Sequence, residues 1–177
     1  MAARTPFLAR ILDKKPSQND VMDLRLDSSI IPAKYALVIL HAIYLDTLDF
    51  RLIENGPIVP EVNDENQNDM IVQDAMNLYE IGRFLEFNFL AQSCEDMLMQ
   101  YLNINNVVTI LNWSLNPYGS SWISRQAYQF LEEEFFTIST RLDVIGSLTQ
   151  STMIRILKSD FAQASESEVL QALIKCK

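Results

Sequence analysis

Residues Phe84–Leu102 read FLEFNFLAQSCEDMLMQYL, and this stretch decides how we interpret the rest of the chain. Its apolar side chains recur at steps of three and four residues: Phe87, Leu90, Cys94, Met97 and Tyr101. On an α-helix this spacing places them on one face, while the polar residues between them face water. A break near Gly82 or Phe87–Asn88 would separate this helix from the one before it. We interpret the stretch as the helix that joins two helical modules of comparable length.

The chain before this stretch contains several segments with distinct patterns. Ala2–Leu12 indicates a short helix, and the alternation of apolar and charged residues in Met22–Leu26 predicts a strand with one buried face. Pro32–Leu45 is apolar almost all round, which is typical of a helix buried on several sides. Arg51–Asp69 contains two prolines and an excess of acidic residues, and predicts a solvated loop. Met70–Arg83 then predicts another helix.

The chain after this stretch predicts a run of short helices. Asn103–Asn106 supplies candidate helix caps, and Val107–Trp113 indicates a helix that ends at the turn-forming residues Asn116–Gly119. Ser120 or Ser121 is suited to cap the following helix. Because the links are short, we expect neighbouring helices to bury their apolar stripes against one another.

The composition excludes several classes of function. The 177 residues include 14 basic and 23 acidic ones, for a net charge of −9, and the only basic cluster is Lys14-Lys15. We therefore predict neither nucleic-acid nor membrane binding. The N-terminal residues are broken by charges, unlike a signal peptide. The two cysteines lie in apolar helical patterns and form no disulfide framework, which indicates an intracellular protein of the cytoplasm or nucleus.

The sequence contains no motif of a known catalytic, cofactor or metal site. His41 is the only histidine and has no ligand or nucleophile partner at useful spacing, so we expect a packing role for it. Cys94 lies on an apolar face, as core thiols do. With 23 acidic residues in the chain, a catalytic pair of carboxylates stays an open alternative. No pattern in the sequence places two of them in an apolar cleft. The acidic loop lacks the ligand spacing of a calcium-binding loop. We predict a non-enzymatic protein without a cofactor.

An aromatic loop offers a candidate surface for protein binding. Trp113, Tyr118 and Trp122 lie within ten residues of one another, around Pro117 and Gly119. Tyrosine and tryptophan concentrate binding energy when they fill a partner's pocket. The alternative is that both tryptophans pin the loop onto its neighbouring helices. We expect Tyr118 to be the most exposed of the three, and take Tyr118 and Trp122 as candidate contact residues.

Several short runs carry a resemblance through their order and spacing. They are AARTPFL at Ala2–Leu8, LDSSIIP at Leu26–Pro32, the set Leu90, Cys94, Glu95 and Leu98, and SDF at Ser159–Phe161 followed by Ser165-Glu166 and Glu168-Val169. Together they resemble the BTB/POZ family, in a member whose BTB fold is followed by a BACK domain. The resemblance covers nearly the whole chain.

The resemblance implies a mainly α fold of the α+β kind. Residues 1–102 would form an incomplete BTB/POZ domain that includes the acidic loop 51–69, and residues 103–177 would form a helical BACK domain. The opening strands and the first helix of a BTB fold have no counterpart in this sequence. Because that first helix usually builds the BTB dimer, a homodimer would depend on the missing N-terminal helix.

The resemblance also implies a protein-binding adaptor or scaffold. It suggests an adaptor of cullin-3 ubiquitin ligases or a regulator of epithelial cell behaviour, with cullin-3 contacts at Phe7–Lys15 and Leu102–Leu115. Phe7, Ile11 and Asp13 are the candidate contact residues of the first segment, and Asp13 occupies the register nearest to the glutamate of the family's apolar-x-Glu motif. The alternative is an oligomeric structural or nuclear scaffold without a link to a ligase.

Overall fold

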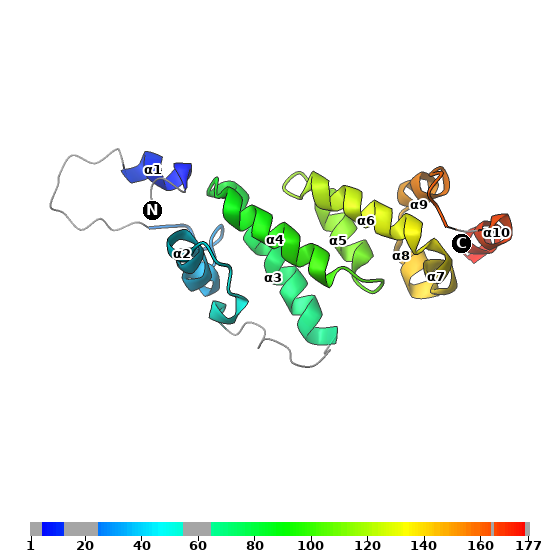
Figure 1. Ribbon diagram of the computed structural model, residues 1–177, viewed down its shortest axis with the longest axis horizontal. Helices are drawn as coiled ribbons and strands as arrows, with labels where there is room; N and C mark the ends of the chain where they lie inside the picture. Colours follow the sequence, from blue (N-terminus) through cyan, green and yellow to red (C-terminus); the bar gives the residue numbers. More distant parts are fainter. Residues whose placement is uncertain (1–4, 13–24, 55–64, 164, 176–177) are drawn as a thin grey trace. The chain divides into compact units, whose positions relative to one another are not determined.

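The computed structural model describes residues 5–12, 25–54, 65–163 and 165–175 (Figure 1). The chain divides into two compact units, Met1–Leu98 and Met99–Lys177. The prediction of a mainly helical fold is confirmed, because helices account for all regular structure in the described residues.

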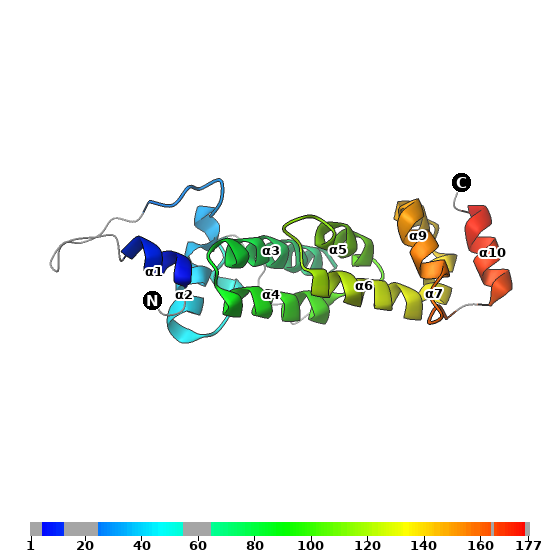
Figure 2. The same cartoon turned by 90° about the horizontal axis from the view of Figure 1, so that it is seen from above.

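The first unit is built around a pair of long helices. Its α-helices are α1 (Pro6–Leu12), α2 (Ala36–Leu45), α3 (Glu65–Phe84) and α4 (Asn88–Tyr101), and short 3₁₀ turns η2 (Ala33–Tyr35) and η3 (Phe50–Leu52) flank α2. α3 and α4 lie side by side in both views (Figures 1 and 2). Fully or almost fully buried side chains line these helices and the turn between them: Leu78, Leu85, Phe87, Leu90, Cys94 and Leu98. The apolar stripe of the α4 sequence therefore faces the core.

The turn between α3 and α4 gives this hairpin its shape. Glu86 adopts a left-handed backbone with φ of 54°. The N–H of Phe87 donates to the carbonyl oxygen of Gly82 (2.8 Å), and the N–H of Glu86 donates to that of Arg83 (3.2 Å). These bonds form a Schellman motif, which usually has glycine at the left-handed position. A Cβ on Gly82 would lie 3.0 Å from the backbone nitrogen of Ala91, so glycine allows the two helices to approach closely.

The predicted strand is not seen in the described residues. Met22–Leu24 lie outside them, and Arg25 and Leu26 are irregular. A single strand without a neighbour leaves its backbone N–H and C=O groups unpaired, so an alternating pattern does not form a strand by itself.

The expectation that Pro32–Leu45 is buried on several sides is wrong for one face. Within α2 the buried side chains are Val38, Ile39, Ala42 and Ile43. On the other side four large apolar side chains are 42–63% exposed: Leu37, Leu40, Tyr44 and Leu45. Burial depends on what packs against a helix, and the composition of the helix alone does not specify that.

The acidic segment 51–69 is only partly a loop. α3 begins at Glu65 rather than at Met70, so the last acidic residues are helical. Acidic side chains are favourable in the first turn of a helix, because they face its partial positive charge. Residues 55–64 lie outside the described part of the chain. Before them Arg51 lies in η3, where the Asp49 carboxylate accepts its backbone N–H (3.0 Å).

The second unit contains short helices around its own core. They are α5 (Val107–Ser114), α6 (Ser121–Glu133), α7 (Phe135–Thr140), α8 (Leu142–Ser147), α9 (Gln150–Leu157) and α10 (Glu166–Lys175). α5 packs along α6, α9 contacts α6, and α10 contacts α7 and α8. The expected cap at Ser120 is confirmed, since its hydroxyl accepts the N–H of Ile123 (3.1 Å). Buried side chains from α5 to α9 form one cluster that includes Leu111, Ala127, Leu131, Phe135 and Ile156.

Candidate protein-interaction surfaces

Helix α1 carries two of the contact residues chosen from the sequence. Leu8 is buried, whereas Phe7 and Ile11 are half-buried and keep accessible apolar surface. The ring of Phe7 packs against that of Phe84, with the ring centres 4.9 Å apart and the planes tilted by 50°. Asp13, the third chosen residue, lies outside the described residues.

An ion pair fixes α1 to the turn between α3 and α4. The two terminal nitrogens of the Arg10 guanidinium, Nη1 and Nη2, donate to the two carboxylate oxygens of Glu86, and Nη1 lies 2.9 Å from Oε2. This fork lowers the pKa of Glu86. Both side chains are exposed, so the pair adds little to stability, but its two parallel bonds restrict the orientation of α1. No local pattern could indicate this pair, because its members are 76 residues apart in the sequence.

A buried polar cluster joins the η2–α2 segment to α3. The hydroxyl of Tyr35 donates to Oδ1 of Asp74 (2.6 Å), Lys34 Nζ donates to the same oxygen (2.9 Å), and Asn77 Nδ2 donates to the Tyr35 hydroxyl (2.9 Å). Burial and the bond to Asp74 raise the pKa of Tyr35. Because each buried polar group has a partner, this cluster fixes the segment in place instead of destabilising it.

The exposed side of α2 is a second candidate surface, which sequence reasoning did not identify. Leu37, Tyr44 and Leu45 are each more than 60% exposed. Large apolar patches on a protein surface often mark interaction sites. The sequence feature that could have indicated this surface was the apolar composition on all sides of the helix, which we interpreted as burial. His41, on the same helix, has Nδ1 within 3.1 Å of the Thr47 carbonyl oxygen, consistent with a packing role.

The aromatic loop between α5 and α6 presents Tyr118. Tyr118 is 76% exposed, as expected, whereas Trp113 and Trp122 are half-buried against the helices. The loop folds back through bonds from Asn116 N–H to the Trp113 carbonyl (3.0 Å) and from Gly119 N–H to the Asn116 carbonyl (2.9 Å). The partial burial of the tryptophans agrees with the packing interpretation, and the role of Tyr118 and Trp122 as contact residues stays a prediction.

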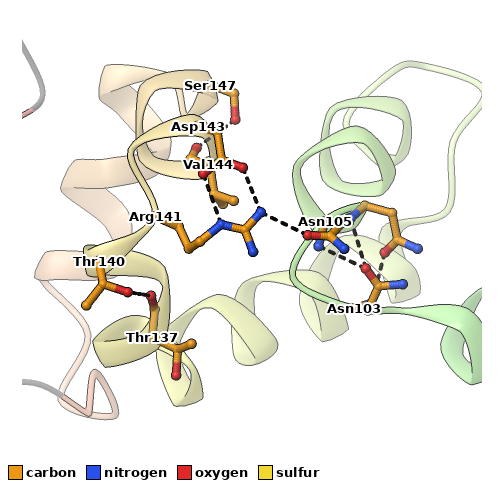
Figure 3. A network of polar contacts seen from close by, with 9 residues as sticks. Asn103, Asn105, Thr137, Thr140, Arg141, Asp143, Val144 and Ser147 are labelled. Carbon is orange, nitrogen blue, oxygen red and sulfur yellow. Dashed lines mark hydrogen bonds and ion pairs between the residues drawn. The ribbon is translucent and has the colours of Figure 1, made fainter. Parts of the chain in front are cut away.

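A polar network in the second unit connects the start of α5 to the start of α8 (Figure 3). The guanidinium of Arg141 donates to both carboxylate oxygens of Asp143 (3.0 and 2.7 Å) and to Oδ1 of Asn105 (3.0 Å). The side-chain oxygen Oδ1 of Asn103 accepts a hydrogen bond from the backbone N–H of Asn105 (2.8 Å). Asn106, expected as a cap of α5, makes no capping bond to that helix. Its buried side chain instead donates to the Tyr101 carbonyl at the end of α4 (2.8 Å).

This network predicts a measurable pH effect. The bonds from Arg141 lower the pKa of Asp143 to about 2, from an ordinary value of 3.8. A lowered pKa in the folded state means that the carboxylate contributes stability above its unfolded pKa, and that this contribution is lost as the pH falls through about 2. In carboxyl-detected NMR titrations we expect Arg141→Gln to move the Asp143 midpoint up towards 3.8. Arg51→Gln should leave it unchanged. An Asp143 that already titrates near 3.8 in the native chain would contradict the network.

The described residues contain no arrangement that favours chemistry. They hold no cluster of three or more histidine, cysteine or acidic side chains that could bind a metal ion. Cys94 is completely buried, and burial raises the pKa of its thiol, so it stays protonated and is a poor nucleophile. In the described part of the chain, no helix combines the length and apolarity that a membrane crossing needs.

Curated proteins that resemble this chain share one domain in their names. Human BTB/POZ domain-containing protein 7 is 38% identical over 190 aligned residues, which cover 99% of this chain. The mouse protein of that name is 37% identical over the same share. This chain is related to the BTB/POZ protein family. Human Kelch repeat and BTB domain-containing protein 3 is a weaker match, 24% identical over 54% of the chain.

The BTB/POZ relationship confirms the resemblance found in the sequence. The chain spans only 17% of the length of the two BTB/POZ domain-containing proteins and 15% of the Kelch-repeat protein. No family model and no solved structure matches the chain. BTB domains are protein-interaction modules, so the relationship supports an adaptor class of function. The assignment of residues 103–177 to a BACK domain stays a prediction.

Proposed function

We propose that this chain is the non-enzymatic docking part of an intracellular adaptor that binds cullin-3. Its relationship to BTB/POZ proteins supports the adaptor class. The observation that carries the proposal is helix α1, where Phe7 and Ile11 keep accessible apolar surface on a helix that an ion pair between Arg10 and Glu86 joins to the α3–α4 turn. A cytoplasmic or nuclear location, and a role in epithelial cell behaviour, follow as parts of this proposal.

The geometry of α1 suits docking for two physical reasons. Apolar side chains that become fully buried at the centre of an interface supply most of its binding energy. A helix whose orientation is already restricted loses less conformational freedom on binding, so more of that energy appears as affinity. Leu102–Leu115 is the second proposed contact segment, and Leu115 at the end of α5 is 52% exposed.

The test replaces one apolar contact at α1. We expect the chain to bind the N-terminal region of cullin-3, and Ile11→Lys to weaken binding roughly tenfold or more, because a charge would be buried in the interface. Biolayer interferometry on the full 177-residue chain measures both affinities. Leu142→Lys is the matched control, since Leu142 is 61% exposed and lies on α8. A chain that shows no binding, under conditions that recover a known adaptor, would rule out the cullin-3 proposal.

The exposed side of α2 favours a second candidate, an oligomeric scaffold without a link to a ligase. A surface that presents Leu37, Leu40 and Tyr44 can self-associate through apolar contact. Light scattering separates the two candidates, because a strict monomer at high concentration would argue against a scaffold. Cullin-3 binding by such a monomer would leave the adaptor as the remaining candidate.

A further inference from the structure

A hollow in the second unit combines charged groups with an exposed aromatic ring. It encloses about 420 Å³ between α6, α9 and the segment that follows α9. Small-ligand and side-chain sites commonly have volumes of roughly 300–1,000 Å³. Arg125 and Arg155 line it, and Phe161 forms part of its wall. Phe161 is 78% exposed, which is unusual for a phenylalanine in a folded unit.

One of the two arginines is held in place by stacking. The guanidinium carbon of Arg155 lies 3.6 Å from the centre of the buried Tyr128 ring. A guanidinium that stacks on a ring keeps its N–H edges free to bind a planar anion through two bonds. This contact also restricts the movement of the side chain, so less conformational freedom is lost when an anion binds.

Neither arginine of the hollow has a carboxylate partner among the described residues. Arg10, Arg51 and Arg141 each form an ion pair within the chain. Arg125 and Arg155 form none in the described residues, although the chain carries 23 acidic residues. Two guanidinium groups that line one hollow and lack a carboxylate partner among the described residues are suited to bind an acidic group from another molecule.

The wall of the hollow is formed in advance. The N–H of Gln163 donates to the carbonyl oxygen of Glu132 on α6 (3.0 Å), and the N–H of Phe161 donates to the Ser159 hydroxyl (3.2 Å). The first bond ties the segment after α9 to α6, and the second is a local bond within that segment. The backbone that carries Phe161 is therefore held beside the hollow that the two arginines line.

Two carboxylates in the hollow limit the charge of the ligand. Glu132 and Glu133 also line it, and Glu133 accepts a bond from Gln129 (2.8 Å). Two arginines and two glutamates sum to no net charge, so a polyanion such as RNA gains no overall attraction here. One or two carboxylates beside an apolar side chain fit better, because the carboxylates reach the arginines and the apolar group packs on Phe161.

We infer that this hollow binds an acidic peptide segment of a partner protein, through its carboxylates at Arg125 and Arg155 and through an apolar side chain at Phe161. The inference rests on the proposed interaction function and names a partner chemistry for its second unit. The site shares no residue with α1.

A synthetic peptide tests the inference on the intact chain. The probe is acetyl-Asp-Glu-Leu-Asp-Glu-amide carrying a fluorophore, and polarisation measures its binding. We expect saturable binding with Kd below about 1 mM, and a loss of about fivefold or more in Arg155→Gln, in Arg125→Gln and in Phe161→Ala. Arg155→Lys should recover only part of the affinity, because it restores the charge without the planar fork. Glu133→Gln should tighten binding, since it removes a repelling carboxylate.

The controls make each result decisive. Arg83→Gln removes one arginine charge outside the hollow and should leave binding unchanged. The same peptide with asparagine and glutamine in place of its acidic residues should not bind. Absence of binding at 1 mM peptide (about the weakest affinity expected), or equal losses in Arg155→Gln and Arg83→Gln, would overturn the inference.

Two further measurements identify other occupants. If inorganic phosphate displaces the probe far better than acetate does, the site takes phosphate groups and the assignment to carboxylates is wrong. If Arg155→Gln lowers the molar mass of the particle that light scattering measures, the occupant is a second copy of the chain and the inference also fails.

Cullin-3 binding is measured on the same variants and should not change. A chain that binds cullin-3 but not the peptide therefore refutes this inference alone.

Discussion

Replacing Cys94 with aspartate should destabilise the first unit by about 3–5 kcal/mol at pH 7. Cys94 is completely buried on α4, between the fully buried Leu90 and the almost fully buried Leu98. Burial raises the pKa of the thiol, because a negative charge at this site would lose its hydration. A carboxylate placed there would lose its hydration without gaining a partner, and an unpaired buried charge is among the most costly changes in a protein core.

The pH dependence of this variant has a definite sign. Burial would raise the pKa of the introduced carboxyl group above its unfolded value, so the neutral form is the one compatible with folding. The penalty is then largest at neutral pH and becomes smaller as the pH falls towards the unfolded pKa of about 3.9. Urea denaturation at pH 7 and pH 5, followed by circular dichroism, measures both values.

Two milder substitutions separate charge from shape. Cys94→Ala removes only the sulfur and should cost about 1 kcal/mol. Cys94→Ser should lie between alanine and aspartate, because a serine hydroxyl in a helix can donate to the carbonyl four residues earlier. If the aspartate and alanine variants unfold within about 1 kcal/mol of each other, Cys94 is not in the dry core that we describe. Since α4 continues into the second unit at Met99–Tyr101, we expect hydrogen exchange to rise in both units.

The sequence predicted the parts of the fold that depend on local periodicity. The stripe of Leu90, Cys94 and Leu98 is strong enough to specify a buried helix face by itself. The cap at Ser120 is similarly local, because a hydroxyl and an N–H three residues apart decide it. The family resemblance also depended on local runs of residues, and the relatives confirm it.

Other features depend on contacts that no local pattern contains. Glu86 occupies a left-handed position at which glycine is the usual residue, so a Schellman turn could not be predicted there from residue type. The exposed face of α2 has the same composition as a buried one, and only the folded unit shows which side is covered. The alternation around Leu26 was a local signal, and the described residues contain no strand that could pair with it.

The candidate sites were the least predictable part. Phe7 and Tyr118 could be chosen from residue type and position, but the pairing of Arg10 with Glu86 joins segments far apart in the chain. The hollow beside Arg155 likewise draws its residues from α6, α9 and the segment after α9. Long-range pairing of polar side chains follows from the packing of helices, and it therefore becomes visible only when the packing is known.

Replacing Gly119 with alanine should destabilise the second unit by about 2–3 kcal/mol. A Cβ at this position would lie 2.4 Å from the Trp113 carbonyl oxygen and 2.7 Å from two backbone atoms of Ser114. These atoms belong to the last turn of α5, where Ser114 is buried and its hydroxyl donates to the Leu111 carbonyl (2.7 Å). Backbone atoms held in this way cannot move aside as the end of a flexible side chain can.

The expected cost follows from what the clash would displace. To make room, the loop would have to lift from α5, and the Gly119–Asn116 bond that closes the turn would open. α5 and α6 bury Val108, Leu111 and Leu131 in the core of the second unit, so a shift between these helices loses apolar contacts as well. Hydrogen exchange should increase first in α5 and in the start of α6.

Gly146 provides the matched control, because it lies within α8 and a Cβ added there would meet nothing within 4 Å. Gly146→Ala should stabilise the unit by about 0.5–1 kcal/mol, since alanine loses less backbone freedom than glycine in a helix. The two identical chemical changes should therefore have opposite signs in thermal unfolding. If Gly119→Ala is as well tolerated as Gly146→Ala, the loop does not pack on α5 as described, and Tyr118 is not held in a fixed position for a partner.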